Sequence, residues 1–216
     1  MKNLKTAILT ICTGIMLTSP TYALSHDQEK ALHAGDIAAS VCKGNFNDLR
    51  GIISNALDQN MSIGQIGSVL QAASVCSDMT QVLTAYEVLD TVATERRVRG
   101  KQDVYATSDS QTFDKKCTTS LQTYVQESAL NAYSPSFAQN YSAILSHALC
   151  TKNAELSVIA AVTSLCIKGN EGPLLDLLLQ RAEEQGFDAE FFKELAEHLE
   201  KYAGPEAAAY LKSRLY

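Results

Sequence analysis

The chain of 216 residues is 46% hydrophobic, contains no Trp and only four Pro, and carries a formal net charge of −6. A chain this apolar can bury a core, which excludes an intrinsically disordered protein. The negative charge argues against nucleic acid as a partner, because phosphate binding requires a concentrated basic surface.

The first 23 residues have the pattern of a signal peptide. Lys2 and Lys5 precede an apolar run at positions 7–17, and Ala23 offers a small residue at a cleavage site. The run is too short to span a membrane, and no later segment reaches the roughly 18 apolar residues that a spanning helix needs. We therefore predict an exported, periplasmic protein without a membrane span. Without its two N-terminal lysines the chain has 16 basic against 24 acidic residues, a net charge of −8.

The first half of the remaining chain shows helical periodicity throughout. A first helix is predicted over 27–43, and a second follows the turn Lys43-Gly44-Asn45 and ends at Asn60. The second helix has one apolar face, with the spacing i, i+3, i+4, i+7, i+8, formed by Leu49, Ile52, Ile53, Ala56 and Leu57.

A third helix is predicted to begin after Ser62, and a fourth to cover 80–97. Ser62 at the N-cap and Gln65 three residues later form a capping box, and Met61 and Ile66 form a hydrophobic staple. The basic run 96–101 that ends the fourth helix is interpreted either as an anion-binding segment or as a solvated linker.

The second half repeats this plan at a shift of 126 residues. Gly186 corresponds to Asn60, and both residue types tolerate the left-handed conformation that ends a helix. Asp188 takes the N-cap place of Ser62, and Phe187 and Phe192 take the places of the stapled pair. Helices are also predicted over 153–168 and 205–215. The sequence thus predicts two copies of one helical unit.

No strand pattern of useful length is present, so we predict an all-α fold. The predicted organisation is a signal peptide at 1–23, a first unit at 24–100, a linker with connecting helices at 101–149, and a second unit at 150–216.

Five cysteines remain after the signal peptide, and export would place them in an oxidising compartment. Cys42 and Cys76 belong to helices that should pack together, so we predict a disulfide between them. Cys150 and Cys166 cannot pair across a continuous helix, because about 16 residues at a rise of 1.5 Å separate them by about 24 Å. Cys117 then pairs with Cys150, which leaves Cys166 free. No zinc-ligand spacing occurs, and we predict neither a metal nor a cofactor.

The helical plan resembles the carboxymuconolactone decarboxylase family, which shares its fold with alkylhydroperoxidase D-like proteins. The segment 55–66, NALDQNMSIGQI, is similar to the family's A-L-D-x-G-L-T-x-x-E-I run, and the turn KYAGP at 201–205 is similar to its Y-A-G-F-P turn. The resemblance implies an assembly of such units, so we expect a homo-oligomer, either a trimer of tandem chains or a hexamer-like particle. It also implies a small organic acid as the ligand.

The active-site motifs of that family are mostly replaced. Thiol peroxidases of the family use a C-x-x-C pair, whereas Cys76 has no Cys within three residues and no His within ten. Of the decarboxylase groups, Glu155 stands at the glutamate of the R-E-L motif, Glu194 at a glutamate of the E-I-x-E motif, and His147 at a histidine found in tandem members. These three residues are the candidate catalytic groups.

Each candidate also has a simpler interpretation. Glu155 is either a general base or an acid stabilised by the helix dipole, and His147 either lines a pocket or caps an amphipathic face. Glu194 and His198, four residues apart, either bind a metal or form an exposed polar pair. His26 and His33 have the spacing of a solvated helix face.

We therefore expect an exported relative of this family that binds a small molecule or serves as a structural oligomer and lacks thiol-peroxidase chemistry. The alternatives are a divergent decarboxylase-type enzyme that acts on a small organic acid, and a peroxiredoxin-like antioxidant. Whether the chain is an enzyme is left open by the sequence.

Overall fold

The computed structural model describes residues 24–101, 155–169 and 172–215, and within them all regular structure is helical. The eight helices of these segments are α1 (His26–Lys43), α2 (Phe46–Asp58), α3 (Ile63–Ala73), α4 (Met79–Val98), α7 (Glu155–Lys168), α8 (Gly172–Glu184), α9 (Ala189–Ala203) and α10 (Pro205–Leu215). The prediction of an all-α fold is confirmed. None of the helices in these segments is long and apolar enough to cross a membrane.

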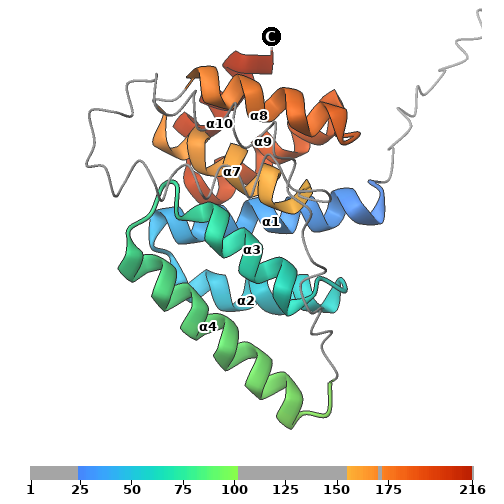
Figure 1. Ribbon diagram of the computed structural model, residues 1–216, viewed down its shortest axis with the longest axis vertical. Helices are drawn as coiled ribbons and strands as arrows, with labels where there is room; N and C mark the ends of the chain where they lie inside the picture. Colours follow the sequence, from blue (N-terminus) through green and yellow to red (C-terminus); the bar gives the residue numbers. More distant parts are fainter. Residues whose placement is uncertain (1–23, 102–154, 170–171, 216) are drawn as a thin grey trace, which may run out of the picture.

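Helix α1 lies between two layers of helices. Figure 1 shows α2, α3 and α4 on one side of it, and α7, α8, α9 and α10 on the other. Both sides of α1 are buried: Ala34, Ile37 and Val41 join a core with α2, α3 and α4, whereas Ala31 and Leu32 join a core with the second-half helices. Burial on both sides explains why α1 is rich in Ala and lacks a single apolar stripe.

Helix α1 packs tightly against α7 and α9 at Gly35. A Cβ atom at this position would lie 2.8 Å from Leu195 Cδ1 on α9 and 3.3 Å from Thr163 Oγ1 on α7. These distances leave almost no room for a side chain, so the missing side chain of glycine allows three helices to meet here.

The helix ends follow the capping signals in the sequence. Gln65 N donates to Ser62 Oγ at 3.1 Å, and the Gln65 side chain accepts from Ser62 N at 2.8 Å, which completes the predicted capping box. Asn60 has φ 61° and Gly186 has φ 93°, so both end their helices in the predicted left-handed region. Asp188 caps α9 through Phe191 N.

The starts of the helices repeat with the shift found in the sequence. Helices α2, α3 and α4 begin at residues 46, 63 and 79, and α8, α9 and α10 begin at 172, 189 and 205, so each pair differs by 126. Equal spacing of helix starts does not by itself establish that the halves are copies of one unit, and the internal repeat stays a prediction.

Candidate functional site

The candidate site is a buried pair of polar side chains, Asp36 and His198, which joins α1 to α9. His198 Nδ1 on α9 lies 2.7 Å from Asp36 Oδ1 on α1, across 162 positions of sequence. The Asp36 side chain is 5% exposed and that of His198 is 33% exposed. A carboxylate this deeply buried lowers the stability of the fold unless it has a hydrogen-bonded partner. His198 is the partner that offsets this loss for Asp36.

The pair changes the protonation of His198. The hydrogen bond that His198 makes to Asp36 raises the pKa of His198 above its ordinary value, burial opposes this, and the charges of Asp36 and Glu194 add to the increase. The pair therefore favours the protonated form of His198, in which Nδ1–H donates to the Asp36 carboxylate.

A second histidine lies one turn before Asp36 on α1. Burial lowers the pKa of His33, the negative charge of Asp36 partly offsets this, and the charge of His198 lowers it further. Asp36 thus raises the pKa of both histidines, but the net shifts are opposite, because burial outweighs this effect at His33 and the hydrogen bond to Asp36 outweighs burial at His198. The prediction that His33 lies on a solvated face is wrong, because its neighbours are the buried Asp36 and the half-buried His198.

The predicted catalytic residues are not brought together as a set. Glu194 lies on α9 one turn before His198 and acts on it through its charge. Glu155 stands in the first turn of α7, where the helix dipole stabilises a carboxylate, and it is outside the group of charges that acts on His198. His147 lies outside the described residues. The prediction of an exposed Glu194–His198 pair is corrected by Asp36, which is the partner that holds His198.

No group of three or more His, Cys, Asp or Glu side chains in segments 24–101, 155–169 and 172–215 is arranged to hold a metal ion. The group formed by Asp36, His198 and His33 is therefore characterised by one hydrogen bond and by the charges of its neighbours.

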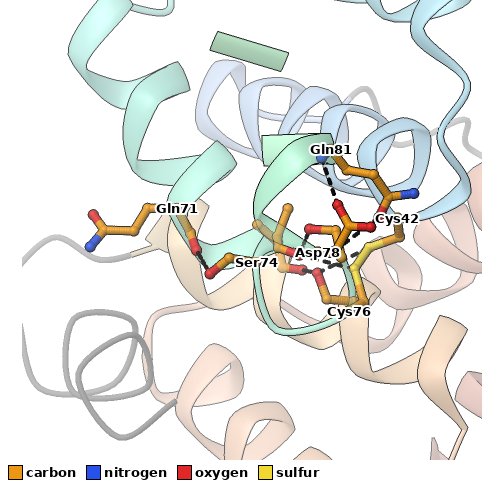
Figure 2. Close-up of a disulfide and its surroundings, with 10 residues drawn as sticks. Cys42, Gln71, Ser74, Cys76, Asp78 and Gln81 are labelled. Atoms are coloured by element: carbon orange, nitrogen blue, oxygen red, sulfur yellow. Dashed lines mark hydrogen bonds between the residues drawn. A yellow bond between two sulfur atoms is a disulfide. The ribbon is translucent and has the colours of Figure 1, made fainter. Parts of the chain in front are cut away.

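The second notable feature is the disulfide between Cys42 and Cys76, with the Cα atoms 5.4 Å apart. The predicted pairing of these two residues is confirmed. Figure 2 shows the bond between the end of α1 and the turn before α4, next to Asp78 and Gln81. The prediction that Cys76 lies on a helix is wrong, because α3 ends at Ala73 and α4 begins at Met79.

The turn that carries Cys76 is fixed at both ends. Ser74 Oγ donates to Gln71 O at 2.7 Å, and Asp78 caps α4 by accepting from Gln81 N at 2.8 Å. On its other side the Cys42 sulfur lies 3.6 Å from Ser164 Oγ of α7. The disulfide therefore ties α1 to the start of α4 at a point where α7 also packs.

Cys166 is the free cysteine of the described segments and is buried in the core of the second-half helices. Burial raises the pKa of its thiol, because the thiolate loses its hydration. Cys117 and Cys150, which were predicted to form a second disulfide, lie outside the described residues.

The basic run 96–101 at the end of α4 binds a carboxylate of the chain itself, that of Asp58. Lys101 Nζ lies 2.7 Å and Arg96 Nη1 2.9 Å from Asp58 Oδ1 at the end of α2. Hydrogen bonds from Lys101 and then Arg96 lower the pKa of Asp58. The interpretation of this run as a solvated linker is corrected for these two residues, which fasten α4 and the following turn to α2.

Comparison with known proteins adds no relative: no protein-family model matches the chain, and no curated protein matches it either. The resemblance to the carboxymuconolactone decarboxylase family therefore remains a hypothesis based on the sequence.

Proposed function

We propose that the chain is an exported, disulfide-stabilised helical protein that binds a small molecule or serves as a structural oligomer, without thiol-peroxidase chemistry. The observation that supports the proposal is the state of the described cysteines. Cys42 and Cys76 are joined to each other, and Cys166 is buried. A disulfide between α1 and the turn before α4 is compatible with an oxidising compartment such as the periplasm.

Thiol-peroxidase chemistry has requirements that these cysteines do not meet. A thiolate must attack the peroxide, and a second thiol must reach the resulting sulfenic acid to form a disulfide. Burial keeps the Cys166 thiol protonated and away from solvent. Cys42 and Cys76 hold two parts of the fold together, so a redox cycle through them would release α1 from the turn before α4.

The alternative of a divergent enzyme for a small organic acid draws support from the Asp36–His198 pair, since a carboxylate that orients a histidine is a common arrangement for a general base. The electrostatics oppose that role. The raised pKa increases the protonated fraction of His198 at any given pH, and a protonated imidazole has no free electron pair to accept a proton. The pair is thus better suited to joining α1 and α9 than to proton abstraction.

The homo-oligomer and the small organic acid ligand remain proposals that rest on the sequence. Among the described residues, Leu83, Tyr86 and Val98 of α4 and Leu177 of α8 are large apolar side chains that are exposed. They are the residues of these segments that a contact between copies would most readily cover.

An assay of hydroperoxide reduction tests the central part of the proposal. We expect the purified protein, supplied with a dithiol reductant, to consume hydrogen peroxide no faster than a small thiol at the same concentration. Cys76→Ser should leave this background unchanged, with Cys166→Ala as the matched variant for the buried thiol. Repeated turnover by the wild-type protein would refute the proposal, and its loss in Cys76→Ser would identify the peroxide-reducing cysteine.

A further inference from the structure

The charged groups around Asp36 come from several helices and form one interacting set. Glu194 and Lys201 of α9 act on His198, and Glu29 of α1 acts on His33. The charges of Asp36, and of Asp48 at the start of α2, also contribute to the raised pKa of Lys201. Helix α2 therefore belongs to the set.

The other helices packed against α1 contribute little charge here. Helix α3 has no ionisable side chain, and α7 meets α1 with the buried, uncharged residues Ser157, Thr163 and Ser164. No charged side chain of α4 is among the groups that act on either histidine. Helix α10 packs against α9, where its Lys212 pairs with Glu200 at 3.9 Å. Asp36 is therefore the buried anion of this junction, and the two histidines are its titratable neighbours near neutral pH.

We propose that Asp36, His33 and His198 form a pH-sensitive latch between α1 and α9, which is tightest near pH 6.5 and loosens on both sides. The latch stands on the 2.7 Å bond between Asp36 and His198, which joins the central helix α1 to α9, and on the place of His33 one turn away on α1. It is independent of the proposed function.

The decline of stability at alkaline pH, here called the alkaline limb, comes from His198. Its pKa in the folded protein lies above the ordinary value of 6.5, which applies to the unfolded chain. The stabilisation from the proton on His198 is therefore complete below pH 6.5, and it is lost as the pH rises through the folded value. Above that value the imidazole is neutral and the charge attraction to Asp36 disappears.

The decline of stability at acidic pH, here called the acidic limb, comes from His33. Its pKa in the folded protein lies below 6.5, so the unfolded chain binds a proton in a range where the folded chain does not. The stability linked to His33 is complete above pH 6.5 and falls as the pH drops towards the folded value. Protonation of His33 also places a second positive charge beside His198. The two limbs together give a maximum near pH 6.5.

Urea unfolding of three histidine variants between pH 5 and pH 9 separates the limbs. In His198→Gln we expect the alkaline decline to vanish and the unfolding equilibrium constant to rise about tenfold below pH 6.5, the effect of losing a charge-assisted hydrogen bond. In His33→Gln the acidic decline should vanish. His26 is 52% exposed, so His26→Gln is the matched control and should keep both limbs.

Differences between each variant and the wild type are compared, so that other titrating groups cancel. A profile of His198→Gln that runs parallel to the wild type over the whole range would overturn the proposal. So would a loss of either limb in His26→Gln.

A titration of the histidine ring protons by NMR in the wild-type protein gives a second test, which does not require any variant to fold. Two of the four histidines should titrate on opposite sides of 6.5, one above and one below, and assignment should give His198 and His33 respectively. In Asp36→Asn, both values should fall, because Asp36 raises both. His198 titrating at or below 6.5 in the wild type would overturn the proposal.

Discussion

Replacing both Cys42 and Cys76 by Ala is expected to lower the free energy of unfolding by about 3 to 4 kcal/mol. The disulfide links residues 34 positions apart, and removing it gives the unfolded chain the freedom of that loop. The turn that holds Cys76 has its own hydrogen bonds, so the native fold should persist in the variant. Urea unfolding at pH 7 measures the difference.

A buried cysteine that closes no loop provides the comparison. Cys166→Ala removes a sulfur from the core, and its cost should be closer to the roughly 1 kcal/mol that is typical of single substitutions. If the free energy of unfolding of the double variant lies within about 1 kcal/mol of the wild-type value, the disulfide does not stabilise the fold as the structure indicates.

Leu195→Ala is expected to lower the free energy of unfolding by about 2 to 5 kcal/mol, the range for a leucine removed from a core. Leu195 is 0% exposed, and its Cδ1 atom occupies the space above Gly35, where α1, α7 and α9 meet. The lost methyl groups leave a cavity where α9 packs against α1. Thermal or urea unfolding measures the cost.

The same substitution on the outer surface is the matched control. Leu83 on α4 is 56% exposed, so Leu83→Ala should change the free energy of unfolding by no more than about 0.5 kcal/mol. Gly35→Ala should also be tolerated better in the Leu195→Ala variant than in the wild type, because the new methyl group would then have room. Equal costs for the two leucines would contradict the packing described at Gly35.

The features that could be predicted from sequence are those set by neighbouring residues. The capping box of Ser62 and Gln65, and the left-handed Asn60 and Gly186, depend on a few consecutive residues, and all occur as expected. The start of α4 has the same kind of signal in Asp78 and Gln81. That signal would have placed Cys76 in the turn before α4 rather than on a helix.

The Asp36–His198 pair could not be predicted in this way, because its members are 162 residues apart and belong to different helices, α1 and α9. Periodicity tells which face of a helix is buried and gives no information on which distant helix covers it. A weak signal existed, since Asp36 stands in the run AGDIAA of small and apolar residues, where a carboxylate needs a partner. Glu155 and Glu194 were chosen from the family resemblance, and only Glu194 lies near this pair.

Labelling of thiols before and after denaturation, followed by mass spectrometry of proteolytic peptides without reduction, tests the proposed structural role of the cysteines most directly. We expect Cys42 and Cys76 to be recovered in one linked peptide, and Cys166 to remain unlabelled in the native protein and to react fully in denaturant. Native labelling of Cys42 or Cys76, or rapid native labelling of Cys166, would show that accessible thiols are present and would contradict the account.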